Sequence, residues 1–105
     1  MKEIKAFIHR NRISDVVHEL KQAGYKYISV VDVLGLLKAL SSQEQQYSVD
    51  MGTKVVSEIK LELVCEDHQL DDAVDIISRQ GRTGQNTAGW IYVTEVEQAI
   101  KINGG

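Results

Sequence analysis

Residues 55–81, VVSEIKLELVCEDHQLDDAVDIISRQG, change from a period of two to a period near 3.6, and this change decides the fold class. Residues 55–65 are predicted to form a half-buried strand, because apolar residues from Ile59 to Cys65 largely alternate with charged ones. After Glu66 the apolar positions follow a helical stripe that Gly81 ends, namely Leu70, Ala73, Val74 and Ile77. Acidic residues near the start of this stripe suit the positive end of a helix: Asp67, Asp71 and Asp72. The stretch therefore predicts a strand followed directly by a helix.

The same order occurs in the first part of the chain. Residues 2–9 alternate like a strand, and the next apolar stripe has helical spacing, with Ile13, Val16, Val17, Leu20 and Ala23. Asn11 is the expected N-cap of this helix, and Gly24 is the expected residue that ends it. Three more strands are candidates, one long and two short: YKYISVVDVLGLL at 25–37, WIYV at 90–93 and AIKI at 99–102.

Two consecutive strand–helix–strand units predict an α+β fold. They form a ferredoxin-like βαββαβ plait, a four-stranded antiparallel sheet with both helices on one face. A chain of 105 residues has the length of one domain, so we predict a single domain over residues 1–105. The other sheet face would carry Val31, Val33 and further aliphatic side chains, which favours oligomerisation through that face.

Between Lys38 and Lys54 the sequence is polar, rich in Gln and Ser, and without clear periodicity. This pattern predicts a long loop. Loops of this length in a compact domain are uncommon and often functional, so we interpret it as an interaction element.

Composition and charge exclude several classes of protein. The chain is 43% hydrophobic and 26% charged, as is usual for a globular domain. Its net charge of −3, without a basic stripe, argues against a nucleic-acid partner. Charged residues interrupt the apolar positions near the N-terminus, so neither a signal peptide nor direct membrane insertion is expected. Cys65 is the only cysteine, which favours a reducing compartment and hence the cytoplasm.

Four segments together resemble the PII signal-transduction family over the whole chain. They are VVDVLG ending at Gly35, KLELV containing Glu62, RTG at 82–84 before Gly89, and YVTEVEQAIKI at 92–102. The resemblance implies a non-enzymatic regulator that is a homotrimer of plaits, with an adenine nucleotide (ATP, ADP or AMP) bound in each cleft between subunits. It also implies that a loop, residues 37–54 here, contacts a protein partner.

The resemblance assigns ten residues to the nucleotide site: Ser29, Gly35, Lys38, Glu62, Val64, Arg82, Thr83, Gly84, Gly89 and Lys101. Glycines let backbone N–H groups approach an anion, and the Arg82 guanidinium offers a planar fork of donors. Lys38 and Lys101 stand where the family usually has arginine, so they keep the charge without the bidentate geometry.

Other positions depart from the family pattern around the phosphates. Trp90 replaces a lysine, Asn103 an arginine, Ala88 an aspartate and Thr87 a glycine. Fewer cations imply a weaker hold on a triphosphate, so ADP or AMP is expected to compete better with ATP than in typical members.

The residues that typical members use for sensing are also changed. Ala39 replaces the glutamine that helps to hold Mg²⁺, and Glu58 replaces the lysine that meets the carboxylate of 2-oxoglutarate. Met51 aligns with the tyrosine that many members have uridylylated, while Tyr47 lies at a different offset. We therefore expect no conventional response to 2-oxoglutarate.

By analogy with divergent members, the implied partner is a membrane transporter, in the regulation of nitrogen, carbon or metal transport. Two other functions remain open. A trimeric divalent-metal-tolerance-like protein would use Cys65 and His68, although two donors do not close a metal site and no metal is predicted. An acylphosphatase-like enzyme would need an anion loop, for which Arg10, Asn11 and Arg12 fit by residue type only. The RTG segment also fits a simple turn, and Glu62 a solvent-facing carboxylate.

Overall fold

The computed structural model describes residues 1–32 and 58–105. The loop predicted at 37–54 lies outside the described residues, as do Gly35, Lys38, Ala39 and Met51. The elements, in chain order, are β1 (Lys2–His9), the 3₁₀ helix η1 (Arg10–Arg12), α1 (Ile13–Gln22), β2 (Ile28–Asp32), β3 (Glu58–Cys65), the 3₁₀ helix η2 (Asp67–Gln69), α5 (Leu70–Gln80) and β4 (Gly89–Glu95).

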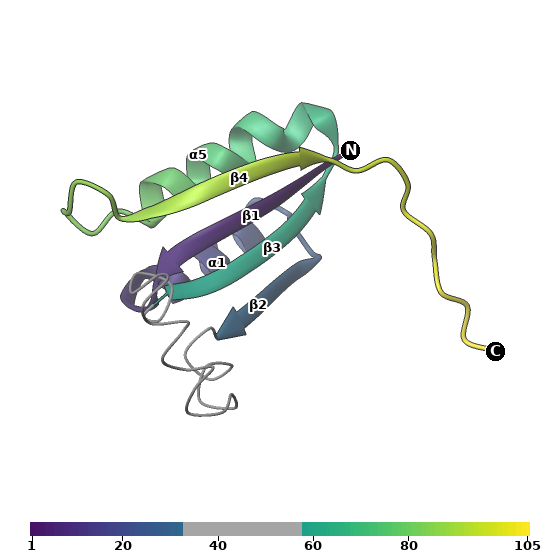
Figure 1. Ribbon diagram of the computed structural model, residues 1–105, viewed down its shortest axis with the longest axis horizontal. Coiled ribbons are helices and arrows are strands. Elements are labelled where there is room, and N and C mark those ends of the chain that lie inside the picture. The colour runs from purple at the N-terminus through teal and green to yellow at the C-terminus, as the bar shows by residue number, and fades with distance from the viewer. Residues whose placement is uncertain (33–57) are drawn as a thin grey trace, which may run out of the picture.

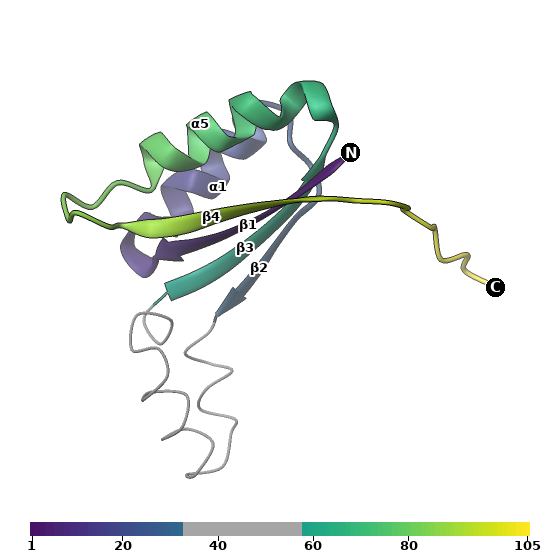
Figure 2. The same ribbon diagram turned by 45° about the horizontal axis from the view of Figure 1, so that its top comes forward.

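The four strands form one antiparallel sheet in the order β2-β3-β1-β4, with both helices on the same face (Figures 1 and 2). This arrangement confirms the predicted ferredoxin-like plait. The central strands β1 and β3 come from different strand–helix units, and their pairing joins the two units into one domain.

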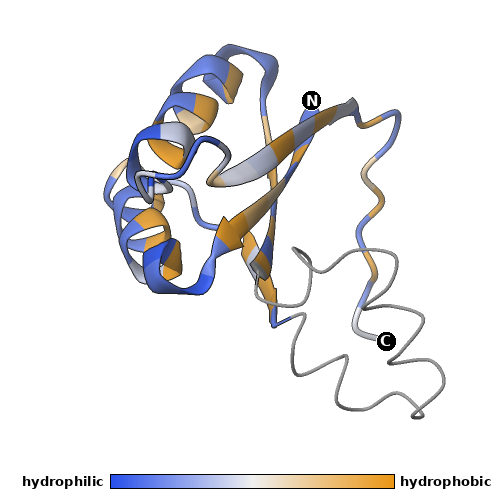
Figure 3. Cartoon of the chain, turned by 60° about the vertical axis from the view of Figure 1, so that its left-hand side comes forward, coloured by the Kyte–Doolittle hydropathy of each residue, from blue (hydrophilic) through white to orange (hydrophobic). Residues whose placement is uncertain are grey.

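The core lies between the sheet and the helices. On β1 the alternation places Ile4, Ala6 and Ile8 inside, and β3 contributes Ile59, Leu61, Leu63 and Cys65. The helices cover them with a smaller set: Val16, Leu20, Ala73, Ile76 and Ile77. Figure 3 shows this amphipathicity as apolar stripes on helices whose other faces are hydrophilic. Cys65 is thus a buried core residue, as interpreted from the sequence, and burial raises the pKa of its thiol.

The predicted N-cap of the first helix is wrong. Asn11 lies inside η1, and its backbone N–H donates to Nδ1 of His9 over 3.2 Å. Arg12 precedes α1 and makes no side-chain capping bond. A 3₁₀ turn therefore connects β1 to α1, and the side chain before that turn accepts one of its free N–H groups.

The predicted end of α1 is confirmed. Gly24 has a φ of 98°, its N–H donates to the carbonyl of Lys21, and the N–H of Tyr25 donates to the carbonyl of Leu20, both over 3.0 Å. These two bonds form a Schellman motif, in which glycine adopts the left-handed conformation without steric cost.

Three strands differ from the sequence prediction. β2 begins at Ile28 instead of residue 25, because Tyr25 belongs to the Schellman motif, and β4 runs from Gly89 to Glu95 instead of 90–93. Residues 99–102 form no strand, because no strand in the described residues lies beside them. Residues 96–105, here called the tail, run away from the sheet (Figure 1).

The sheet face opposite the helices, here called the open face, is more polar and aromatic than predicted. Its register places Phe7, Trp90 and Tyr92 on it, with Val31 and Val64 on the other two strands. The rings of Phe7 and Tyr92 make an edge-to-face contact, with centroids 6.0 Å apart. Two ion pairs lie on the same face, Lys5 with Glu3 and Lys60 with Glu62.

Tyr25 connects the end of α1 to the start of α5. Its hydroxyl lies 2.9 Å from Oδ2 of Asp72 and 3.0 Å from the carbonyl oxygen of Gln69, both of which accept from it. Burial raises the pKa of Tyr25 to about 12, and the hydrogen bond to the Asp72 carboxylate adds to this effect.

Tyr25→Phe is expected to lower the free energy of unfolding by about 1 to 2 kcal/mol at neutral pH, because it removes a hydrogen bond to a charged group. The folded-state pKa lies above the ordinary value of 10, so the wild-type hydroxyl contributes stability below pH 10. That contribution is lost as the pH rises toward about 12. Urea unfolding at pH 7 and at several values from 9.5 upward measures both effects. Tyr27→Phe is the control, since Tyr27 is 84% exposed, and an equal effect of the two changes would contradict this assignment.

Candidate functional site

The loop at 82–88 links α5 to β4 and contains the RTG segment. α5 ends where the N–H of Gly81 donates to the carbonyl of Ile77 over 2.9 Å. The Oγ1 of Thr83 then accepts from the N–H of Gln85 over 3.4 Å, and Gly84 has a φ of 88°. The segment is thus a local turn that needs glycine at position 84, and a turn of this kind also suits anion binding.

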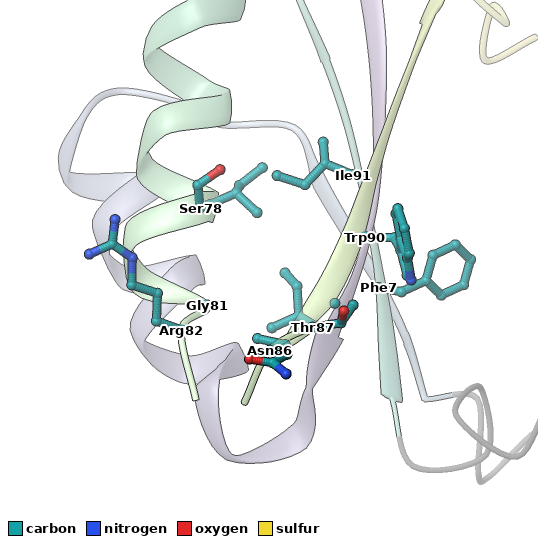
Figure 4. Close-up of a pocket in the computed structure, with 12 residues that line it drawn as sticks. Phe7, Ser78, Gly81, Arg82, Asn86, Thr87, Trp90 and Ile91 are labelled. Carbon is teal, nitrogen blue, oxygen red and sulfur yellow. The ribbon is translucent and has the colours of Figure 1, made fainter. Parts of the chain in front are cut away.

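This loop borders a hollow of about 360 Å³ between α5 and β4, here called the loop hollow (Figure 4). Its apolar lining includes Ile8, Ile77 and Ile91, and its polar lining consists of Ser78, Arg82, Asn86 and Thr87. Small-molecule sites have this composition and usually occupy roughly 300 to 1,000 Å³. The hollow can therefore hold a ligand with an apolar body and an anionic end.

Arg82 differs from the other three arginines of the chain. Arg10 makes a bidentate pair with Asp32 at 2.7 and 2.9 Å, and Arg79 pairs with Asp75 at 2.9 Å. Arg12 donates from Nε to the carbonyl of Gln80 over 2.8 Å and also pairs with Asp15. Arg82 is exposed and makes no hydrogen bond or ion pair with any other residue that the structure describes. Its guanidinium is the one available to an incoming anion.

The same pairs argue against an acylphosphatase-like anion loop. Such a loop would need the guanidinium groups of Arg10 and Arg12 to point at a bound phosphate. Both are held by protein partners instead, and the hydrogen bonds to Asp32 raise the pKa of Arg10.

Gly89 has a structural role that the sequence did not indicate. A Cβ at this position would lie 2.1 Å from the carbonyl oxygen of Phe7 on the neighbouring strand β1. Close approach of the two backbones at the start of β4 therefore requires glycine. Its part in nucleotide binding stays a prediction.

Ser29, Glu62 and Val64 form a second group of predicted site residues on the open face. Ser29 and Glu62 are direct partners in the pairing of β2 with β3. With Val64 they line a separate hollow of about 410 Å³, together with Glu3, Lys26, Tyr27, Ile28 and Leu63. Glu62 is half-buried and pairs with Lys60 at 3.0 Å, so it is not a freely solvated carboxylate.

One chain does not bring the two groups together. We call Arg82, Thr83, Gly84 and Gly89 the loop half-site, and Ser29, Glu62 and Val64 the sheet half-site. Gly89 on β4 is the partner of Ile8, whereas Glu62 on β3 is the partner of Lys5, so β1 lies between them. Strand spacing and rise separate their Cα atoms by roughly 14 Å. Lys101 lies in the tail and lines neither of the two hollows.

Phe7, Ser78 and Asn86 also line the loop hollow, although they were not predicted from the sequence. Phe7 is the β1 partner of Trp90, and Figure 4 shows both rings on the same side of the sheet. Pairing the alternating positions of residues 2–9 with those of 90–93 could have indicated this contact. Ser78 and Asn86 carry no distinguishing pattern.

The metal-site alternative has no support in the part of the chain that the structure describes. Cys65 is buried in the core, His68 is exposed in η2, and no group of three or more His, Cys, Asp or Glu side chains there could hold an ion. Among the described helices, none has both the length and the apolar character that crossing a membrane requires.

Comparison with known proteins identifies the family. The family model described as nitrogen regulatory protein P-II matches residues 1–105. Nitrogen regulatory protein P-II 1 of Methanothermobacter thermautotrophicus is 30% identical over 105 residues, which cover 100% of this chain and 91% of that protein. Nitrogen regulatory protein P-II of Rhodobacter capsulatus is also 30% identical, with 94% of its length covered.

Nitrogen regulatory protein GlnK of Escherichia coli is 27% identical over 105 residues, again covering 100% of this chain and 94% of the relative. These relatives are named as regulatory proteins, and the family consists of non-enzymatic signalling proteins. The chain belongs to the P-II family of signal-transduction regulators.

Proposed function

We propose that this protein senses adenine nucleotides as a homotrimer. ATP, ADP or AMP binds in each cleft between subunits and biases the segment 37–54 between states that do and do not engage a protein partner. The observation that carries the proposal is the division of the predicted site into two partly exposed half-sites. Each is incomplete in one chain, and each becomes complete when the loop half-site of one subunit meets the sheet half-site of the next.

The two half-sites supply complementary chemistry. In the loop half-site, Arg82 offers a guanidinium that has no partner among the described residues, beside a glycine turn whose backbone an anion can approach. In the sheet half-site, Ser29 offers a hydroxyl and Glu62 a carboxylate, which can accept from ribose hydroxyls or an exocyclic amine. The first suits phosphates and the second suits a nucleoside.

The small number of cations near the loop half-site should narrow the preference for ATP over ADP and AMP. Arg82 is the only cation that lines the loop hollow among the described residues. Trp90, which is 55% exposed, follows Gly89 at the position where typical members have lysine. An indole provides a stacking surface instead of a positive charge. ADP and AMP should therefore compete with ATP more effectively than they do in members with that lysine.

The partner that we favour is a membrane transporter. This choice rests on analogy with divergent family members, while the relatives' names refer to nitrogen regulation. In this proposal the protein itself acts in the cytoplasm, and segment 37–54 makes the contact.

Calorimetric titration of the purified protein with ATP, ADP, AMP and cyclic AMP tests the proposal. We expect binding of at least one of the first three, with a stoichiometry of up to one per subunit and with ATP favoured over ADP by less than about tenfold. If ATP, ADP and AMP all fail to bind, the proposed nucleotide function is overturned. Repeating each titration with 2-oxoglutarate or bicarbonate tests the second effector. A nucleotide affinity that rises with 2-oxoglutarate would contradict the interpretation of Ala39 and Glu58.

A further inference from the structure

Near the end of the tail, Asn103 is followed by Gly104, which places a reactive amide next to an unhindered nitrogen. The side-chain amide of asparagine has a carbonyl carbon that the backbone nitrogen of the next residue can attack, closing a five-membered ring. Glycine has no Cβ to obstruct that approach. Both residues are exposed, and a Cβ built on Gly104 would meet no atom within 4 Å. Neither the next side chain nor the packing of the fold therefore hinders ring closure here.

The backbone around Asn103 is also free to bend into the geometry of the attack. The last hydrogen bond of the tail is donated by the N–H of Val96 to the carbonyl of Met1 over 3.1 Å. Residues 97–105 make no hydrogen bond or ion pair to any other residue that the structure describes. Figure 1 shows this part of the chain leaving the sheet and running out beyond it. A segment with so few contacts changes conformation at little cost in free energy.

The two other asparagines of the chain lie in less favourable settings. Asn11 and Asn86 are exposed as well, so exposure does not distinguish the three positions. Asn11 lies within η1, where its own N–H donates to Nδ1 of His9 over 3.2 Å. Asn86 is followed by Thr87, a β-branched residue whose side chain crowds the nitrogen that would attack. Asn103 alone combines a following glycine with a backbone that no described residue holds.

We propose that Asn103 is a site of spontaneous deamidation. The backbone nitrogen of Gly104 bonds to Cγ of Asn103 and gives up its proton, and the C–N bond of the side-chain amide breaks, so ammonia leaves and a succinimide remains. Water then opens the ring at one of its two carbonyl carbons. Opening at Cγ gives aspartate, and opening at the main-chain carbonyl carbon gives isoaspartate, in which the backbone runs through Cβ and Cγ. Water is the only co-reactant, and nothing is oxidised or reduced.

The modification changes the charge of the tail. Glu97 and Lys101 are its only charged side chains, so their charges balance in the unmodified tail. The new carboxylate at position 103 makes the chain one unit more negative than its formal net charge of −3. It lies two residues from Lys101, on the same side of an extended chain, where the two charges attract. Older chains therefore differ from new ones in charge at one defined position.

Incubation of the full chain in neutral buffer tests the proposal. Samples taken over time are digested and examined by peptide mass spectrometry, which detects the mass increase when an amide becomes a carboxylate. A protein isoaspartyl methyltransferase with labelled S-adenosylmethionine measures the isoaspartate. We expect conversion at Asn103 to be severalfold faster than at Asn11 and Asn86. Conversion at Asn103 that is no faster than at the other two would overturn the proposal.

Two variants test the route of the reaction. Gly104→Ala keeps the amide but adds a methyl group beside the attacking nitrogen, and Asn103→Gln keeps an amide that must close a six-membered ring. Both should slow conversion at position 103 severalfold, with Asn86 in the same chain as the internal reference. Asn103→Asp is the charge standard in isoelectric focusing, and the aged wild type should migrate with it. An unchanged rate in the Gly104→Ala variant would contradict ring closure.

The same measurement on the chain unfolded in guanidinium chloride shows what the fold contributes. The rate at Asn103 should be nearly the same in the folded and the unfolded chain, whereas Asn11 should convert faster once η1 no longer holds it. A rate at Asn103 that is severalfold lower in the folded protein would show that the tail is held in solution, and would overturn the inference. These experiments use no nucleotide, so none of their outcomes decides whether the proposed function is correct.

Discussion

Gly89→Ala is expected to lower the free energy of unfolding by roughly 2 to 3 kcal/mol, the size of a forced overpacking. The new Cβ would lie 2.1 Å from the carbonyl oxygen of Phe7, and neither atom belongs to a side chain that can rotate away. The start of β4 must therefore move from β1, where Gly89 and Ile8 are partners. Urea denaturation at one fixed protein concentration measures the effect, because an oligomer's stability depends on concentration.

Two other glycines provide a graded control for this prediction. Gly84→Ala should cost about 1 kcal/mol, because position 84 has a φ of 88° but open space around its Cβ. Gly104→Ala should change stability little, since its Cβ meets no atom within 4 Å. If Gly89→Ala proves as mild as Gly104→Ala, the close approach of β4 to β1 is not present in solution.

Arg82→Gln is expected to weaken nucleotide binding by about ten- to a hundredfold. The change removes charge-assisted hydrogen bonds to phosphate, which are worth about 1.5 to 3 kcal/mol. It should leave folding stability nearly unchanged, because Arg82 is exposed and has no hydrogen bond or ion pair with another described residue. Calorimetric titration with ATP, ADP and AMP gives the affinities, and thermal unfolding without nucleotide checks the fold.

Arg79→Gln is the matched control for Arg82. It removes the same charge three residues earlier, at an exposed position where the guanidinium already pairs with Asp75. Arg82→Lys should have an intermediate effect, since it keeps the charge and loses the donor fork. Equal affinities in the Arg82→Gln and Arg79→Gln variants would contradict the assignment of Arg82 to the phosphates.

The sequence predicted the elements whose side chains repeat regularly. The period of two in residues 2–9 and 59–65 located the two central strands, and the helical stripes located α1 and α5. Gly24 and Gly81 marked the ends of these helices correctly. Local burial leaves a periodic trace in the sequence, so these features could be found without coordinates.

The predictions from the sequence were wrong where an element depends on local geometry or on a neighbouring strand. Asn11 has the residue type of an N-cap, but the 3₁₀ turn η1 places it elsewhere. Residues 99–102 have a strand-like pattern, but a strand also needs a partner, and the described part of this chain offers none beside them. The side chains of the open face also differ from the prediction, because strand register decides which side chains share a face.

The sequence by itself determined the plait and, through its resemblance to the family, which residues to inspect at the site. Only the tertiary structure decided that these residues form two separate half-sites and that Arg82 is the arginine left for a ligand. Asp32 and Gln80 hold Arg10 and Arg12 across 22 and 68 residues of sequence, and Phe7 imposes glycine at position 89 from another strand. A sequence pattern records how each residue is buried along its own element. Which groups then meet across the fold depends on strand register and packing between distant segments, and these leave no periodic signal.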